Sequence, residues 1–234
     1  MTPLISIIIP TLNEEGQLPA TLAPLAAAAG CEVIVSDGGS GDATRDLGAR
    51  HGCRVVCSPP GRGVQMNAGA AAARAPILLF LHADTLLPQG FAALVEGALA
   101  GRGVSGGAFS LRIAGNSPSL AFIAHAANLR SRLLRLPYGD QALFTTRETF
   151  QRLGGFAETP IMEDVLFVRG LRRLGRLVIL PQAVVTSSRR WDNLGVLRTT
   201  LINQLILIGH GCGIPAPTLA RCYRRLRGLG RKEG

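Results

Sequence analysis

Paired cysteines and long apolar runs are both missing from this chain of 234 residues. The five cysteines are an odd number and form no CxxC pair, which argues against a disulfide framework or a zinc ribbon and for a reducing compartment. The longest apolar segment towards the C-terminus, 201–209, is interrupted by Asn203 and Gln204 and falls short of the roughly 20 residues that span a bilayer. The apolar run at 4–9 is too short for a signal peptide. We therefore expect a cytoplasmic protein, with peripheral contact at the inner face of the membrane as an open alternative.

Aromatic residues are scarce, at 5% of the chain, although the formal net charge is +10. Few aromatic side chains are therefore present on which nucleic-acid bases could stack. A nucleic-acid-binding module explains the positive charge poorly, and we expect no nucleic-acid partner. Residues 1–117 carry 7 Arg and 8 Asp or Glu, a net −1, whereas residues 118–234 carry 18 basic and 7 acidic residues, a net +11. A partner bearing phosphate, or an anionic membrane surface, fits this basic half, and a solvated arginine-rich surface is the alternative.

The first third of the chain alternates short apolar runs with segments of helical length. The runs are LISIII (4–9), CEVIVS (31–36), CRVVC (53–57) and PILLFL (76–81), and the helical segments lie near 14–29, 42–51 and 62–74. Continuous apolar runs indicate strands that are buried on both faces of a parallel sheet. We therefore predict an α/β fold with a mostly parallel central sheet between two layers of helices, a Rossmann-like three-layer αβα sandwich.

The remainder of the chain is less regular. Strands are predicted at 106–113 and 141–146, and helices at 117–135, at RETFQRLGGF (147–156) and over the amphipathic segment after Pro160. A Gly-Gly pair ends the second of these helices, and Thr159 or Pro160 is expected as the cap or first-turn residue of the third. We expect one catalytic domain over residues 1–190, followed by a basic helical extension over 191–234 that packs on or beside it.

Ligands of such sheets bind at the carboxyl ends of the strands, so the residues after each run form the candidate site. These segments are PTLNEE (10–15), SDGGSGD (36–42), SPPGRG (58–63) and HADT (82–85). Three of them carry carboxylates, which would repel one another unless a cation lay among them, and the other carries Arg62. Mg²⁺ and Mn²⁺ prefer one or two carboxylates together with substrate phosphate oxygens. The pattern predicts metal-assisted chemistry on a phosphate-bearing substrate.

The same segments resemble, in order, the motifs of family 2 glycosyltransferases of the GT-A fold. The matching motifs are IIIPTLNEE (7–15), SDGGSGDAT (36–44), GRGVQMNAG (61–69), the acid of HADT at Asp84, and MEDVLF (162–167) preceded by LGGF (153–156). Each motif alone is weak, whereas five in the family's order over about residues 5–180 form a specific pattern. The strings LHAD, GDQ and MED are further similar to a bacterial subset of this family.

The resemblance implies an enzyme that transfers a sugar from a nucleoside-diphosphate sugar, with UDP favoured, to a hydroxyl acceptor that is small or lipid-linked. Mn²⁺ or Mg²⁺ is the implied cofactor. The residues implied to bind the donor are Pro10, Thr11, Asn13, Glu14, Asp37, Arg62 and Asp84, and Asp84 is also the implied metal ligand. Asp164 is implied to be the general base that deprotonates the acceptor, whose in-line attack inverts the sugar's configuration. Taken alone, Asp164 in a first helical turn would only favour the helix dipole.

Two positions depart from the family pattern. Gly38 stands where a second acid is usual, so one donor contact is missing or is made elsewhere. His82 replaces the first acid of D-x-D, and we expect it to contact ribose or to be structural rather than to bind the metal. His210 is a further candidate for a third metal ligand. These departures motivate one alternative, a relative that binds a nucleotide sugar without turnover.

Three further residues are candidate contacts to the acceptor or the sugar: Asp140 of YGDQ, Glu163 of MED and Trp191 of SSRRW. A purely structural role is the alternative for each. The element SSRRW lacks the Gln of the Q-x-x-R-W motif, which argues against a processive enzyme. The basic segment RCYRRLRGLGRK (221–232) predicts either a patch that contacts anionic lipid or a solvated tail.

A sugar-phosphate nucleotidyltransferase is the main alternative enzyme, because it shares the sheet and the metal-binding acid. It would need a glycine-rich loop with arginine and lysine after the first strand, where this chain has PTLNEEGQ. The phosphate loop GxxxxGK[ST] does not occur, and GRGVQM is only a partial GxGxxG placed late in the chain. The sequence therefore favours the glycosyltransferase interpretation.

Overall fold

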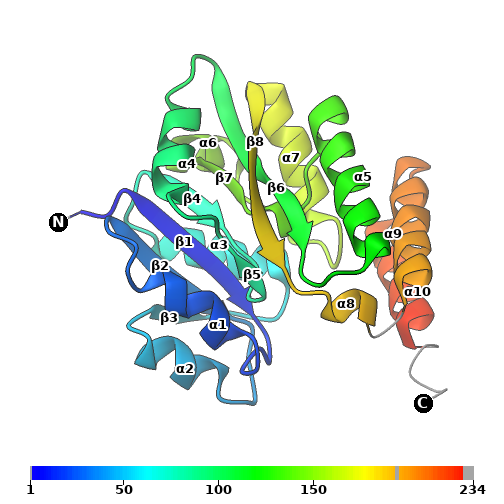
Figure 1. Cartoon of the computed structure of the whole chain (residues 1–234), viewed down its shortest axis with the longest axis horizontal. Helices are drawn as coiled ribbons and strands as arrows, with labels where there is room; N and C mark the ends of the chain where they lie inside the picture. Colours follow the sequence, from blue (N-terminus) through cyan, green and yellow to red (C-terminus); the bar gives the residue numbers. More distant parts are fainter. Residues whose placement is uncertain (1, 193–194, 229–234) are drawn as a thin grey trace.

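The computed structural model describes residues 2–192 and 195–228, and within them one eight-stranded sheet forms the centre of the molecule (Figure 1). Its strands are β1 (Ile5–Thr11), β2 (Cys31–Asp37), β3 (Arg54–Cys57), β4 (Ile77–Phe80), β5 (Thr85–Leu86), β6 (Val104–Ile113), β7 (Leu143–Thr146) and β8 (Arg176–Thr186). The strand order is β3-β2-β1-β4-β7-β6-β8-β5, and only β5 and β7 run against the direction of the other described strands. The predicted mostly parallel sheet is confirmed.

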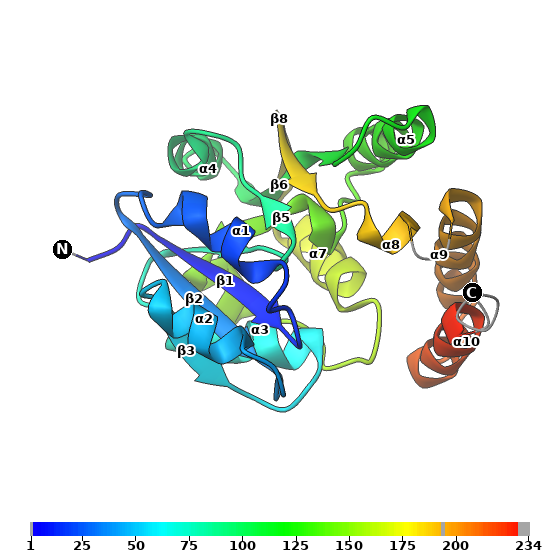
Figure 2. The ribbon, with the colours of Figure 1, turned by 60° about the horizontal axis from the view of Figure 1, so that its bottom comes forward.

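Helices cover both faces of the sheet (Figure 2). They are α1 (Leu18–Leu22), α2 (Thr44–Arg50), α3 (Arg62–Ala72), α4 (Phe91–Leu99), α5 (Pro118–Leu134), α6 (Arg147–Leu153), α7 (Glu163–Leu174), α8 (Arg189–Asp192), α9 (Val196–Gly211) and α10 (Ala216–Gly228), with 3-10 turns at Ala23–Leu25 and Gly139–Gln141. Helices α1, α2, α4 and α5 pack on one face, and α3, α6 and α7 pack on the other. The predicted αβα sandwich is therefore confirmed.

The first four strands lie where the apolar runs predict them. β1 and β4 are buried on both faces, whereas β3, at the edge of the sheet, is half-buried or exposed. Along β1, Ile5, Ile7 and Ile9 belong to the core under α1 and α4, whereas Ile8 belongs to the core under α3 and α7. The second core contains a group of phenylalanine rings, including Phe156 and Phe167 with centroids 4.1 Å apart. A strand that is apolar on both faces suits only a sheet between two helical layers.

Three elements go beyond the sequence prediction: β5, α4 and β8. β8 has 11 residues, but its middle contains Pro181, which has no N–H to donate to a neighbouring strand. The sheet accommodates the proline in a bulge, since Leu180 pairs with Phe109 and the next pair is Ala183 with Ser110. Because β8 is parallel to β6, residues 187–189 emerge at the same edge of the sheet as the ends of β1 and β4.

The helix that carries Asp164 begins at Glu163, two or three residues later than the sequence predicts. The residue before it, Met162, has a φ of 68°, in the left-handed region that side chains other than glycine seldom adopt. The Thr159 hydroxyl donates to the carbonyl of Ile161 at 2.8 Å, within the preceding turn. The prediction that Thr159 or Pro160 caps this helix is wrong, because the buried Met162 occupies the N-cap position.

Helices α9 and α10 lie against each other at one end of the molecule, next to α8 (Figures 1 and 2). An apolar cluster joins them to the start of α7: Met162, Val165, Ile202, Ile206 and Leu219. The division into residues 1–190 and 191–234 stays a prediction, and 193–194 and 229–234 of the predicted extension lie outside the described residues. Over the parts of the chain that the structure describes, none of the helices combines the length and apolarity needed to cross a bilayer.

Candidate active site

Two cavities at the carboxyl end of the parallel strands share a wall. The first cavity, of about 490 Å³, is lined among others by Pro10, Thr11, Glu14, Gln65, Asp84 and Arg189. The second cavity, of about 460 Å³, is lined among others by Tyr138, Asp140, Asp164, Trp191, Ile206 and Tyr223. Arg62 and His82 line both cavities. The predicted metal ligand Asp84 and the predicted base Asp164 therefore lie in adjacent cavities.

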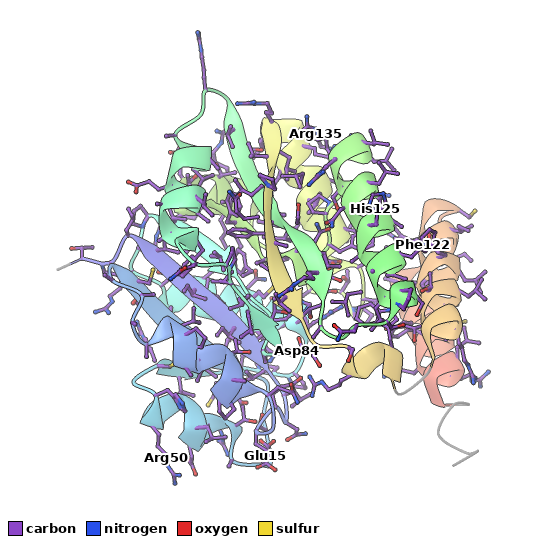
Figure 3. The ribbon with its side chains drawn as sticks, in the orientation of Figure 1. Glu15, Arg50, Asp84, Phe122, His125 and Arg135 are labelled. Carbon is purple, nitrogen blue, oxygen red and sulfur yellow. The ribbon has the colours of Figure 1, made fainter. Side chains whose placement is uncertain are left out.

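In the first cavity, Asp84 shares a cationic partner with Glu14. Nη2 of Arg189 donates to Glu14 Oε2 at 2.7 Å and to Asp84 Oδ2 at 3.2 Å. Partial burial lowers the pKa of the Arg189 guanidinium, but hydrogen bonds and charge from the two carboxylates raise it more. Figure 3 marks Asp84 at the edge of the sheet, beside the short helix α8 that begins at Arg189. The two carboxylates thus converge on one position that holds positive charge.

The pairing of β5 with β8 places Arg189 at this position. Thr85 pairs with Thr186, with their hydroxyl oxygens 3.0 Å apart, and the N–H of Ser187 donates to the carbonyl of Asp84 at 3.0 Å. Arg189 is absent from the sequence-based candidates because Pro181 interrupts the strand before it. The sequence does carry a sign of it, because the arginine pair of SSRRW follows an apolar run directly. Once that run is recognised as a strand, the rule that ligands bind at strand ends makes this pair a candidate.

Gln65 is a second residue that the sequence-based candidates lack. Its buried side-chain amide Nε2 donates to the carbonyls of Thr11 at 2.6 Å and Ser36 at 3.1 Å, which joins the ends of β1 and β2. A Cβ on Gly38 would stand 3.0 Å from the amide carbon and nitrogen of Gln65. The second acid of the family motif therefore has no room here, because the Gln65 amide occupies that space.

Asp37 lies at the end of β2, but it is buried and lines neither of the two cavities. Its Oδ1 accepts from the backbone N–H groups of Gly39 at 3.0 Å and Ser40 at 2.8 Å, and its Oδ2 accepts from the hydroxyls of Thr11 and Ser40. Burial raises the pKa of the Asp37 carboxyl, but these hydrogen bonds outweigh it and hold the pKa below its usual value. An ionised Asp37 shapes the loop after β2, and its contact with base or ribose stays a prediction.

Asn13 also joins loops rather than lining the first cavity. Its Oδ1 accepts from the N–H of Gly41 at 2.9 Å, and its own N–H donates to Ser40 Oγ at 2.9 Å. A φ of 55° at Asn13 turns the chain after β1, so that Pro10, Thr11 and Glu14 line the cavity while Asn13 holds the neighbouring loop. Asparagine tolerates this left-handed conformation better than most residues.

Arg62 and Glu163 form an ion pair at the wall that the two cavities share. Nε of Arg62 lies 2.7 Å from Oε1 of Glu163, whose side chain is 3% exposed. Burial raises the pKa of the Glu163 carboxyl, and Asp164 adds to the rise while Arg62 opposes it. Arg62 is the first residue of α3, and Gly61 and Arg62 bring the N-terminus of this 11-residue helix to the first cavity. Helix N–H groups and a guanidinium together favour a phosphate group.

Asp164 is held in the second cavity by two backbone N–H groups. Gly139 donates to Oδ2 and Val165 donates to Oδ1, each at 2.8 Å. A Cβ on Gly139 would lie 3.1 Å from His82 Nε2 and 3.3 Å from Asp164 Oδ2, so this loop contacts both side chains. The carboxylate is therefore fixed beside the shared wall, where it can accept a proton from a hydroxyl group.

The remaining predicted residues divide into two groups. Asp140 and the buried Trp191 line the second cavity, whereas Glu163 does not line it and instead pairs with Arg62. His210 lines neither cavity, and its Nε2 lies 3.4 Å from Nη1 of Arg169. The structure therefore does not bring His210 together with Asp84.

A divalent metal fits the first cavity through carboxylate oxygens. Among residues 2–192 and 195–228, no three His, Cys, Asp or Glu side chains cluster in a way that could hold a metal by themselves. Glu14 and Asp84 nevertheless converge on the guanidinium of Arg189, so two hard oxygen donors already meet where positive charge is held. Such a pair suits Mn²⁺ or Mg²⁺ when substrate phosphates supply further ligands.

Comparison with solved structures identifies the class of fold as that of the GT-A glycosyltransferases. The chain belongs to glycosyl transferase family 2, whose family model matches residues 6–141. The matched region includes Glu14, Arg62, Asp84 and Asp140 and ends before Asp164. The narrower bacterial subset with LHAD, GDQ and MED stays a prediction.

Three relatives illustrate the similarity. An uncharacterised glycosyltransferase of Mycobacterium tuberculosis is 42% identical over 87 residues, which cover 37% of this chain and 39% of that protein. Validoxylamine A glucosyltransferase of Streptomyces hygroscopicus subsp. limoneus is 38% identical over 110 residues, or 42% of this chain and 24% of that protein. The structure of glucosyl-3-phosphoglycerate synthase from Mycobacterium tuberculosis with Mn²⁺, UDP and glucosyl-3-phosphoglycerate has a TM-score of 0.63 at 24% identity, covering 91% and 81% of the two chains. The sequence matches span less than half of the curated relatives, and the structural match concerns the fold.

Proposed function

We propose that this chain is an inverting, metal-dependent glycosyltransferase that moves a sugar from a nucleoside-diphosphate sugar to a hydroxyl acceptor. The observation that carries the proposal is the pair of adjacent cavities: Asp84 lines one, Asp164 lines the other, and Arg62 and His82 line both. A transfer reaction needs two substrates whose reacting atoms meet, and a shared wall offers that meeting point. The relative that was crystallised with Mn²⁺ and UDP supports UDP-sugars as the first donors to test.

We assign the first cavity to the donor. Pro10, Thr11 and Glu14 line it at the end of β1, and the positive charge of Arg62 at the start of α3 suits the diphosphate. A Mn²⁺ or Mg²⁺ ion held by Asp84, with Glu14 beside it, would stabilise negative charge on the leaving diphosphate. Asn13 and Asp37 would act by shaping the loops around this cavity.

We assign the second cavity to the acceptor and the role of general base to Asp164. The acceptor hydroxyl gives its proton to Asp164 while its oxygen forms a bond to the anomeric carbon of the sugar. The bond from that carbon to the diphosphate oxygen breaks at the opposite side, so the configuration inverts and a nucleoside diphosphate leaves. Asp140 and Trp191 line the same cavity and are the proposed contacts to acceptor or sugar.

The two alternative functions explain the site less well. A nucleotidyltransferase has no use for the aromatic and aliphatic lining of the second cavity, and the loop after β1 carries no basic residue. A relative that binds without turnover is motivated by Gly38 and His82. Gln65 fills the space beside Gly38, however, and Asp164 retains an oriented carboxylate.

Joint stabilisation by a donor and a metal is the first expected result. At about 100 times the dissociation constant, UDP-glucose with Mn²⁺ should raise the melting temperature by roughly 5–10 °C, because binding to the folded state alone contributes about 2.7 kcal/mol. Either component alone should give a much smaller shift, since the diphosphate completes the metal's ligands. Differential scanning fluorimetry with UDP-, GDP- and dTDP-sugars, each with and without Mn²⁺, measures this. The absence of a shift with every donor would overturn the proposal.

Peripheral membrane contact, and with it a cytoplasmic location at the inner face of the membrane, is part of the same proposal. Large apolar side chains are exposed on α5, at Phe122 (73%) and Leu133 (71%), and on α9, at Leu201 (62%) and Leu205 (58%). Figure 3 labels Phe122 on α5, on the side that faces α9 in this view. Exposed arginines occur on the same helices and on α10: Arg132, Arg198, Arg221, Arg224 and Arg225. This combination of apolar and basic groups is complementary to an anionic bilayer.

Vesicle sedimentation tests the membrane contact. We expect the protein to sediment with vesicles of phosphatidylcholine and phosphatidylglycerol but not with phosphatidylcholine alone. The double variant Phe122→Gln/Leu205→Gln should lose most of this binding, whereas Leu174→Gln, at a residue 39% exposed on α7, should retain it. Equal binding to both lipid compositions, or equal binding by the two variants, would contradict this contact.

A further inference from the structure

The second cavity exposes more apolar than polar surface, and its apolar residues come from several elements. Beyond the wall shared with the first cavity, its lining includes Ile161, Met162, Val165, Ile206, Leu207 and Ala220. Aromatic rings at Tyr138, Trp191 and Tyr223 extend this surface. Besides Asp164, the polar side chains of the described lining are Arg62, His82, Asp140, Asn203 and Arg224, and each of the three aromatic residues adds one polar atom. A volume of about 460 Å³ suits a small organic molecule.

The helices of the C-terminal part supply much of this apolar wall. Ile206 and Leu207 come from α9, and Ala220 and Tyr223 come from α10. The cluster that Ile206 forms with Met162 and Val165 attaches this wall to the start of α7, next to Asp164. Asn203 of α9 and Arg224 of α10 line the cavity from the same helices, so this wall is predominantly apolar but also carries polar groups.

From this arrangement we infer that the acceptor is an amphipathic alcohol, whose apolar body lies against α9 and α10 and whose hydroxyl faces Asp164. The inference rests on the proposed function, because it specifies the acceptor class of the second cavity. The reverse orientation would place a hydroxyl against Ile206 and Leu207, where only the few polar groups of α9 and α10 could replace its hydrogen bonds to water, and it would leave the apolar body beside the charged Asp164. Apolar contact with the wall and hydrogen bonding near Asp164 thus select the same orientation of the molecule.

Two matched probes test the inference: octyl β-D-glucoside, below its micelle concentration, and methyl β-D-glucoside. They carry the same sugar hydroxyls and differ only in the alkyl chain. Trp191 is the one tryptophan of the chain and lines the second cavity, so its fluorescence reports on binding there without any turnover. We expect octyl glucoside to change this fluorescence with a dissociation constant at least about tenfold below that of methyl glucoside. In the presence of the donor and Mn²⁺, octyl glucoside should also accelerate UDP release more than methyl glucoside does.

Neighbouring positions on α9 provide the matched control. Leu207→Gln should weaken octyl glucoside binding about tenfold, whereas Ile208→Gln, at a side chain that is 61% exposed and does not line the cavity, should leave it unchanged. Leu207→Ala keeps an apolar residue and serves as a second variant if Leu207→Gln does not fold. Equal affinity for both glucosides, or equal weakening by the substitutions at 207 and 208, overturns the inference.

Donor binding separates this inference from the proposed function. Leu207 does not line the first cavity, so stabilisation by a UDP-sugar with Mn²⁺ should persist in the variants at Leu207. If donor stabilisation occurs but the two glucosides bind equally, the acceptor class is wrong and the transferase proposal stands. If no donor stabilises the protein, the transferase proposal fails, whatever the Trp191 fluorescence shows.

Discussion

Asp164→Asn should reduce sugar transfer by about 10²–10⁴-fold while donor binding persists. An amide has nearly the shape of the carboxylate but cannot accept the proton that the acceptor hydroxyl loses. The substitution also replaces one oxygen that accepts from Gly139 or Val165, so a modest loss of stability, about 1–2 kcal/mol, is expected as well. Transfer is measured as UDP release with an acceptor present, and donor binding as the shift in melting temperature with a UDP-sugar and Mn²⁺.

Glu158→Gln is the matched control for this substitution. Glu158 is exposed, lies in the loop before α7 and lines neither cavity, so the same change of carboxylate to amide should leave the rate of transfer unchanged. Transfer by Asp164→Asn within a few-fold of the unaltered protein would remove Asp164 from the role of base. Loss of the donor-dependent melting shift in the same variant would instead indicate that Asp164 acts in donor binding.

The first cavity is largely predictable because its residues follow strands that the sequence identifies. β1 and β4 consist of apolar runs, and the rule on strand ends then selects Glu14 and Asp84, which the structure places in one cavity. The same rule selects Asp37, but it cannot show that local hydrogen bonds keep that side chain within its own loop. Sequence position fixes where a side chain starts, whereas the atoms that it contacts depend on the loop conformation.

Arg189 shows how one missed strand conceals a site residue. Arg189 follows β8, and Pro181 in the middle of that strand makes the mostly apolar segment hard to recognise as a strand from the sequence. A proline normally argues against a central strand, and β8 tolerates it only through a bulge that depends on the partner β6. Since the bulge is a property of the pair of strands, β8 taken alone gives no reliable sign of it.

The second cavity depends on orientations that the sequence does not encode locally. Apolar residues occur around all sides of α9, with Ile202 and Ile206 buried but Leu201 and Leu205 exposed, so periodicity cannot tell which face meets the cavity. The left-handed backbone at Met162 then sets where α7 begins. Tertiary packing, rather than any motif, brings α9 and α10 to Asp164.

Asp84→Asn and Arg189→Gln should change metal binding in opposite directions. Removing the charge of Asp84 should weaken the Mn²⁺-dependent binding of UDP by at least about 100-fold, because the carboxylate is the proposed protein ligand. Removing the guanidinium should instead strengthen the binding of Mn²⁺ alone by roughly 3- to 10-fold, since Arg189 competes for the same oxygens of Glu14 and Asp84. The gain is small because these side chains are partly exposed, and ion pairs of this kind contribute little.

Titration of free Mn²⁺ by electron paramagnetic resonance measures the metal alone, and calorimetry with UDP and Mn²⁺ measures the complex. Arg45→Gln is the control for the arginine variant, because Arg45 lies 3.9 Å from the carboxylate of Asp37 but lines neither cavity. It removes the same charge and should leave Mn²⁺ affinity unchanged.

If Arg189→Gln and Arg45→Gln strengthen Mn²⁺ binding equally, the effect is a general one of net charge. If Arg189→Gln weakens it, Arg189 supports the metal site and does not compete with the ion. The proposal requires both results: stronger Mn²⁺ binding in Arg189→Gln but not in Arg45→Gln, and weaker Mn²⁺-dependent binding of UDP in Asp84→Asn. Together they would show that Glu14 and Asp84 bind either the Arg189 guanidinium or a divalent ion.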